Sequence, residues 1–174
     1  MKKRCLWLLL LTSFCTFICA ENDAIYYSDQ NLHIKFTIDK EKKEAIVGTG
    51  TKEDDSALAL PAWDNAWWDN QVNLWEDVVI PSVIEYGGET YTVTSVASYA
   101  FYRTTRLKRI TLPETIRSIG SAAFYWCVNL ESINIPSQVT AINSETFVLC
   151  RKLKSIQLPN SVQSIGGSAF QSCI

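Results

Sequence analysis

The sequence predicts a β-rich solenoid: a stack of 23-residue units with a β-hairpin cap at its N-terminal end. Phenylalanine recurs at a step of 23 residues, at Phe101, Phe124, Phe147 and Phe170. Five further columns of apolar residues, proline or cysteine keep the same step. Each unit also contains a short stretch in which apolar and polar residues alternate, as they do in a half-buried strand. One such unit cannot bury its apolar face alone, so the units are expected to stack against one another.

The five further columns define the unit. They are Leu107, Leu130 and Leu153; Ile110, Ile133 and Ile156; Pro113, Pro136 and Pro159; Val96, Ile119, Ile142 and Ile165; and Cys127, Cys150 and Cys173. Residues 110–112 alternate as a strand, and the proline that follows lacks the N–H of a further rung. Gly120, Asn143 and Gly166 share one column, where we expect a tight bend with positive φ. Residues 123–127 are expected to form about one helical turn with its apolar side inward.

The first 20 residues have the layout of a secretory signal peptide. A basic start at residues 2–4 precedes an apolar run from Cys5 to Cys19, and Ala20 offers a small residue for cleavage. The run is short for a membrane span, which needs about 20 apolar residues, so no transmembrane helix is predicted. Bulky Ile18 before Cys19 disfavours the alternative of a lipidated cysteine. We expect export, with cleavage near Ala20.

Residues 21–74 do not repeat, and residues 75–174 carry the repeats. Residues 32–38 alternate and residues 45–47 return, which predicts a hairpin that covers the first apolar face of the stack. The first unit begins at Trp75 and contains an insertion, in which Gly87 and Gly88 lie between two β-prone runs and predict a tight hairpin. The last unit is incomplete, which favours a fragment of a longer protein over a last repeat left open to water.

Charge is distributed unevenly along the chain. Without residues 1–20 the chain has 13 basic and 18 acidic side chains, a net charge of −5. Residues 21–80 carry a net charge of −8, and residues 81–174 carry +3. Neither part has the basic run and high pI that are typical of nucleic-acid-binding surfaces. The sequence therefore predicts no nucleic-acid partner.

Three segments of the repeat region resemble a known family. The strings VVIPSVIEYGGETYTVTSVASYAFY, ITLPETIRSIGSAAFYWC and INIPSQVTAINSETFVLC are similar to the BspA-type leucine-rich repeats of bacterial surface proteins, common in the Bacteroides group. The resemblance covers residues 75–174. It implies a leucine-rich-repeat solenoid on a secreted or cell-surface protein, and several members of the family are associated with adhesion to host proteins or other cells. The family has no catalytic motif to carry over.

No constellation of residues predicts catalysis, a cofactor or a metal site. His33 is the single histidine, and no nucleophile with a partner is recognisable near it. The three cysteines at a 23-residue step are interpreted as a ladder in the core, with a disulfide between neighbours or a metal site as weaker alternatives. We therefore expect a protein that is not an enzyme.

The candidate binding surface follows from strand alternation, because residues between inward positions face outward. These residues are Lys108, Arg109, Thr111, Glu131, Ser132, Asn134, Lys154, Ser155 and Gln157. Opposite charges in the column of Lys108, Glu131 and Lys154 are also expected to stabilise the sheet. Aromatic residues offer alternative sites: the rings of Trp63, Trp67 and Trp68 could stack on sugars, whereas Tyr125 and Trp126, beside the expected helical turns, form a competing surface for the partner. For the first three, packing onto the first repeat is the favoured interpretation.

These observations predict an exported or cell-surface binding module that mediates adhesion through a protein ligand, such as a host-matrix protein or the surface of another cell. Two alternatives remain. The Trp-rich segment around Trp67 could make the chain a carbohydrate-binding module. The repeats could instead be a structural stalk that displays a downstream domain.

Overall fold

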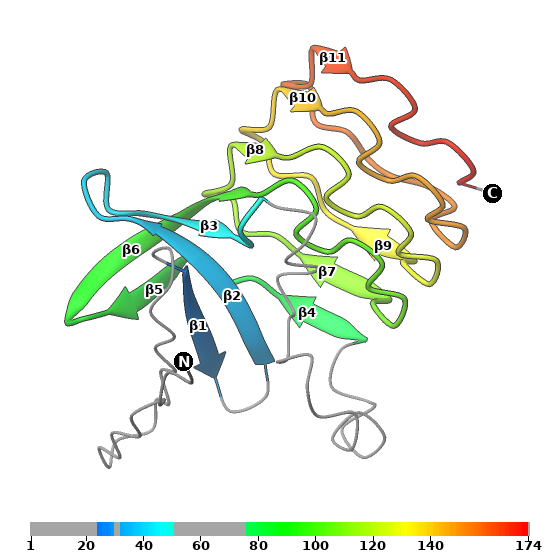
Figure 1. The fold of residues 1–174 in the computed structure, drawn as a ribbon. Coiled ribbons are helices and arrows are strands. Elements are labelled where there is room, and N and C mark those ends of the chain that lie inside the picture. The colour runs from blue at the N-terminus through cyan, green and yellow to red at the C-terminus, as the bar shows by residue number, and fades with distance from the viewer. Residues whose placement is uncertain (1–23, 30–31, 51–75, 174) are drawn as a thin grey trace, which may run out of the picture.

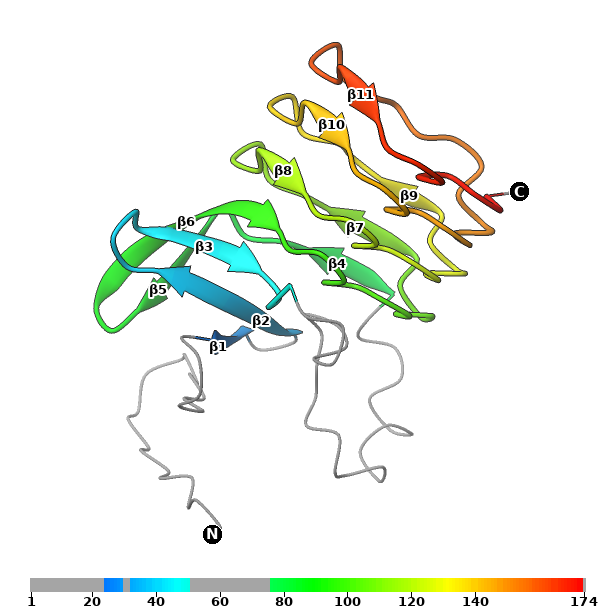
Figure 2. The ribbon, with the colours of Figure 1, turned by 45° about the horizontal axis from the view of Figure 1, so that its top comes forward.

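The computed structural model describes residues 24–29, 32–50 and 76–173. The predicted signal peptide and Trp63, Trp67, Trp68 and Trp75 lie outside the described residues. Short strands and turns make up the described chain, which contains no helix. Figures 1 and 2 show its coils stacked from an N-terminal sheet to the C-terminal coil.

Eleven strands form three sheets in the described residues. The largest has the order β1-β2-β3-β6-β5, and β8 pairs with β6; the second has the order β4-β7-β9, and the third joins β10 and β11. The strands are β1 Ala24–Asp29, β2 Leu32–Asp39, β3 Glu44–Val47, β4 Asp77–Val79, β5 Val83–Tyr86, β6 Glu89–Val96, β7 Arg109–Thr111, β8 Ser118–Ile119, β9 Ser132–Ile133, β10 Ala141–Ile142 and β11 Ser164–Ile165.

The N-terminal sheet is continuous with the repeats. β2 and β3 pair antiparallel, and β3 then pairs in parallel with β6 of the first coil. Phe36 and Val47 from these strands are fully buried in the same core as the coils behind them. The predicted hairpin of the insertion is confirmed, since β5 and β6 pair antiparallel across Gly87 and Gly88, both with positive φ.

Phenylalanine rings stack through the centre of the coils. Phe101, Phe124 and Phe147 are fully buried, and the centroids of successive rings lie 5.1 and 5.4 Å apart with nearly parallel planes. Phe170 continues the stack at 5.4 Å from Phe147. The prediction that Phe124 and Phe147 are buried between equivalent rings is therefore confirmed.

The expected helical turn is wrong, and the hydrogen bonds explain why. Ala123, Tyr125 and Cys127 donate to carbonyls three residues back, whereas Ala122, Phe124 and Trp126 donate to the next coil. A helix would direct every N–H along its own axis, so it could not bind a neighbouring coil. In a series of tight turns, every second backbone N–H remains available to donate to the neighbouring coil. We call this series, at residues 98–103, 121–126, 144–149 and 167–172, the turn column.

The expected positive φ at Gly120 and Gly166 is also wrong. A Cβ on Gly120 would lie 2.3 Å from the backbone nitrogen of Ser98, so this position requires glycine for the close approach of two coils. Asn143 occupies the same column and carries a Cβ. Its side-chain amide donates to the carbonyl of Ile119 at 2.6 Å. The strands that meet at this position, β8 and β10, are not paired and belong to different sheets.

Candidate binding surface

The strands β4, β7 and β9 place most of the predicted binding residues on one exposed face. Their parallel register aligns Asp77 with Arg109 and Ser132, while Val78, Ile110 and Ile133 of the next rung are buried. We call the predicted set the sheet face: Lys108, Arg109, Thr111, Glu131, Ser132, Asn134, Lys154, Ser155 and Gln157. Lys108 is half-buried and the other eight are exposed. Residues 154–157 lie beyond the last strand of this sheet, in a segment without strand pairing.

Ion pairs join the first two coils of this face. Lys108 Nζ lies 2.7 Å from Glu76 Oε1, and Arg109 Nη2 lies 2.5 Å from Asp77 Oδ2. The acidic neighbour also raises the pKa of Arg109. The charge column therefore begins one coil earlier than the sequence interpretation placed it, and Lys108 pairs with Glu76 instead of Glu131. Both pairs are partly exposed, so each adds little to stability.

Asn134 continues the hydrogen-bond ladder beyond the point where backbone pairing of β9 ends. Its side-chain Oδ1 accepts from the Leu112 N–H at 2.7 Å, and its Nδ2 donates to the Leu112 carbonyl at 2.8 Å. The amide thus replaces one peptide group beyond the end of β9. Its polar atoms bond to the neighbouring coil, which leaves Arg109, Thr111 and Ser132 as the predicted residues that lie exposed on ordered strands.

A second exposed surface lies on the turn column. Tyr102 and Tyr125 stack with ring centroids 5.2 Å apart, and Tyr99 meets Tyr102 edge-on at 5.9 Å. The guanidinium carbon of Arg103 lies 4.8 Å from the ring centroid of Trp126 and 5.6 Å from that of Tyr102. Trp126 is 38% exposed, so this surface combines aromatic area with a held cation.

The three cysteines of the repeats are free thiols inside the stack. Each donates to the carbonyl of the phenylalanine in the preceding coil: Cys127 to Phe101 at 3.0 Å, Cys150 to Phe124 at 3.2 Å and Cys173 to Phe147 at 3.1 Å. Burial raises the pKa of Cys127 well above its usual value and that of Cys150 to about 12. A buried thiol of this kind is a poor nucleophile, which agrees with the core-ladder interpretation.

A hollow of about 340 Å³ lies where β2, β3, β6 and β8 meet. Its lining is mostly small or hydroxyl-bearing, and none of the lining residues is titratable: Thr37, Ile46, Gly48, Thr49, Gly50, Ser95, Val96, Ala97, Ser118, Ile119, Gly120 and Asn143. The lining of this hollow therefore offers no side chain that could act as a general acid or base. The described residues contain no cluster of His, Cys, Asp and Glu that could hold a metal ion. No helix among them is long and apolar enough to cross a membrane.

The coil geometry defines a leucine-rich-repeat fold, and comparison with known proteins assigns the family. The family described as BspA type leucine rich repeat region matches residues 88–174, half of the chain, as six copies. The chain belongs to this family. No curated protein matches it.

Solved structures show the same fold. A leucine-rich repeat protein from Bacteroides ovatus is 32% identical, with a TM-score of 0.63, over 80% of this chain and 32% of that one. The T. pallidum leucine-rich repeat protein is 28% identical, with a TM-score of 0.61, over 80% of this chain and 54% of that one. A third, from Bacteroides capillosus, is 22% identical, with a TM-score of 0.62, over 86% of this chain and 94% of that one. The chain thus spans about a third and about half of the first two.

Two features of these surfaces carried no sequence signal. The turn column has positive φ at Tyr99, Arg103, Trp126 and Leu149, where no glycine or asparagine marks the conformation. Arg103 and Trp126 share a 23-residue column, but sequence alone did not show that the guanidinium lies over the indole ring.

Proposed function

We propose that this chain is an exported binding module, with no catalytic step, and that its sheet face receives a protein ligand. The supporting observation is the separation of roles along the strands. Val78, Ile110 and Ile133 hold the stack together, while Arg109 and Ser132 lie exposed on the neighbouring rung of the same strands. Exposed positions differ from coil to coil, so they can encode specificity without disturbing the core. A host-matrix protein or the surface of another cell is the proposed partner.

The organisation of the chain is part of the proposal. Residues 21–74 serve as the N-terminal cap, and 23-residue units follow from residue 75, the first with an insertion and the last incomplete. The burial of Phe36 and Val47 supports the cap, because these residues cover the apolar edge of the first coil. Residues 1–20 are the export signal, cleaved near Ala20. Intact-mass analysis of the exported protein should give an unlipidated N-terminus near Glu21.

A double substitution tests the sheet face. Thr111→Arg with Ser132→Arg puts two bulky charges on exposed positions of neighbouring strands. The control carries Thr140→Arg with Ser164→Arg, two exposed positions outside these strands that receive the same change in charge and volume. Binding to a panel of immobilised matrix proteins should fall at least about tenfold for the first variant only. Equal binding by both variants, with unchanged melting, would contradict the sheet-face proposal.

A further inference from the structure

A tight turn in each of three coils joins the turn column to the segment that follows it, which is a strand in the first two. Leu107 donates to the Thr104 carbonyl at 3.3 Å, Leu130 to that of Cys127 at 3.0 Å, and Leu153 to that of Cys150 at 3.1 Å. The two central residues are exposed in the first turn, Thr105 and Arg106, and in the third, Arg151 and Lys152, whereas those of the middle turn, Val128 and Asn129, are half-buried. The Asn129 side chain donates to the Thr105 carbonyl at 2.6 Å and fixes one turn on the next.

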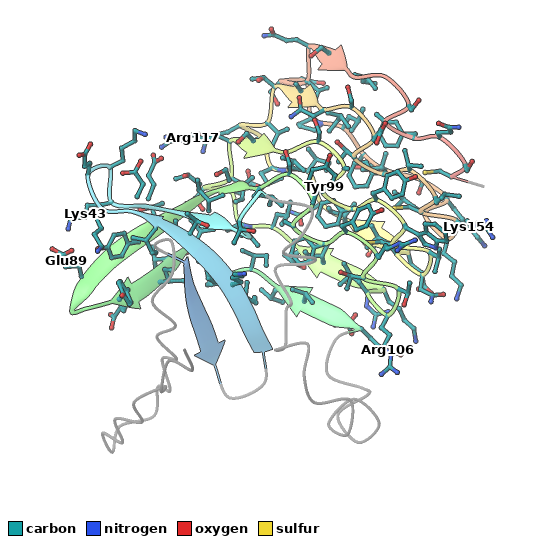
Figure 3. All side chains as sticks on the ribbon, viewed as in Figure 1. Lys43, Glu89, Tyr99, Arg106, Arg117 and Lys154 are labelled. Carbon is teal, nitrogen blue, oxygen red and sulfur yellow. The ribbon has the colours of Figure 1, made fainter. Side chains whose placement is uncertain are left out.

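Cations gather on these turns. Arg106, Arg151 and Lys152 are exposed, and none of them forms an ion pair with a described residue. By contrast, Lys108 and Arg109 in the adjoining strand segment are paired with Glu76 and Asp77. The middle coil contributes Asn129 and, further along, the exposed Glu131. We call Arg103, Arg106, Arg151 and Lys152 the basic corner. Figure 3 shows Arg106 and Lys154 on the same side of the stack, the side away from Arg117.

Aromatic rings adjoin the basic corner. Arg103 belongs to both groups, because its guanidinium lies over the rings of Trp126 and Tyr102. Such contact restrains a long side chain, so less conformational freedom is lost when an anion binds it. Tyr125 is stacked on Tyr102, and Trp126 remains 38% exposed.

We propose that the basic corner, together with Tyr125 and Trp126, binds an acidic polysaccharide. Guanidinium and ammonium groups pair with sulfate or carboxylate, and exposed aromatic rings pack against the apolar faces of sugar rings. The cations of the first and third turns lie two coil steps apart, about 10 Å, which suits a chain that carries anions at intervals. An acidic peptide would pair with the cations but would not need the exposed rings of Tyr125 and Trp126 for binding. This site is separate from the sheet face and does not depend on a protein ligand.

A charge-matched pair of variants tests the cations. The first carries Arg106→Gln, Arg151→Gln and Lys152→Gln. The control carries Lys40→Gln, Lys42→Gln and Arg117→Gln, which removes three exposed positive charges elsewhere; Figure 3 shows Arg117 on the side away from Arg106 and Lys154. Binding of the purified chain to immobilised heparin is measured at about 0.15 M NaCl, a physiological ionic strength. The first variant should lose about tenfold in affinity and the control less than about twofold. Equal losses would overturn the proposal.

A ring substitution distinguishes a polysaccharide from an acidic protein. Trp126→Leu is suited to this position, because Leu149 already occupies the same column with the same backbone conformation. The variant should bind heparin several-fold more weakly and bind poly-L-glutamate unchanged. Neutral dextran should not bind the parent chain. If poly-L-glutamate binds as tightly as heparin and Trp126→Leu affects neither, the ligand is an acidic protein and the polysaccharide assignment is wrong.

Discussion

Residues in the left-handed conformation occur at fixed places in the turn column. Two columns hold eight of them: Tyr99, Ala122, Glu145 and Ser168; and Arg103, Trp126, Leu149 and Ser172. This conformation costs an L-residue about 1–2 kcal/mol, and none of the eight is glycine. The hydrogen bonds of the stack offset the cost, since the N–H of Trp126 reaches Val148 and that of Glu145 reaches Gly167. Where these positions are exposed, as at Arg103 and Trp126, the backbone conformation therefore does not dictate the side chain, which can contribute to a binding surface.

Glu145→Gly should stabilise the chain by about 0.5–1 kcal/mol. The substitution removes the left-handed penalty at φ 60° and keeps the backbone hydrogen bond, although glycine returns part of the gain as chain entropy. Glu131→Gly is the control, because Glu131 is equally exposed and lacks positive φ. It should destabilise by about 0.5–1 kcal/mol in urea denaturation. Loss of stability in both variants would contradict the argument.

The buried thiols make stability depend on alkaline pH. The pKa of Cys150 is about 12 in the folded chain against an ordinary value of 9.0, because burial disfavours the thiolate. The unfolded chain therefore releases its proton first as pH rises. The stability that comes from the protonated Cys150 thiol is fully present below about pH 9. Between pH 9 and 12 the unfolding free energy falls by up to about 1.4 kcal/mol per pH unit.

Cys150→Ala should have a shallower decline in unfolding free energy from pH 8 to 10.5 than the parent chain, measured by urea denaturation. The substitution removes no other titratable side chain, so the difference between the two declines reports the Cys150 thiol. Parallel declines would show that Cys150 ionises freely in the folded state.

At the scale of elements, the phenylalanine stack gives each coil its central contact. Phe124 is fully buried between two rings, whereas Phe170 is half-buried and stacks on Phe147. Phe124→Ala should cost about 3–5 kcal/mol, the usual range for a buried phenylalanine. Phe170→Ala should cost clearly less. Thermal or urea unfolding that gives the two variants equal stability would contradict this register of the coils.

Close approach of coils sets a second requirement. Gly120→Ala places a Cβ 2.3 Å from Ser98 N, and the obstructing atoms are backbone, so the coils must separate at a cost of about 2 kcal/mol or more. Gly167→Ala is the control, since nothing lies within 4 Å of its added Cβ. That variant should unfold within about 0.5 kcal/mol of the parent chain. A stable Gly120→Ala protein would mean that the coils separate easily.

Periodicity made the coils predictable, and unusual backbone geometry did not. Burial repeats at every unit, so the inward columns and the paired strands of β4 and β7 followed from the alternation of residues. Gly120 signalled its column, but glycine serves both positive φ and close approach, and sequence could not separate these uses. On the surface, the exposure of Arg109 and Ser132 was predictable. The use of Asn134 as a substitute peptide and the pairing of Lys108 with Glu76 depend on the alignment of coils in space.

At the scale of the whole molecule, support for the coils is unequal. The mixed sheet of β2, β3 and β6 covers one end, where Phe36 and Val93 are fully buried. At the other end Ile165 is 56% exposed, although Ile119 and Ile142 in the same column are fully buried. In a stack in which each coil contacts its neighbours, a coil with one described neighbour is expected to be less stable than a coil with two.

Amide hydrogen exchange should therefore slow from the last coil toward the first. The N–H of Phe124 donates to Thr146 at 2.9 Å within a coil that has described neighbours on both sides. The amides of residues 164–173 belong to a coil packed against one described neighbour, and it opens without disturbing the rest. After correction for intrinsic rates, we expect protection at residues 121–127 to exceed that at 164–173 by at least about tenfold, or about 1.4 kcal/mol of opening free energy. Residues 34–38 should match the central coils, because they share the buried core. Uniform protection across all coils would instead mean that the solenoid opens as one cooperative unit, and unequal support would then have no bearing on its stability.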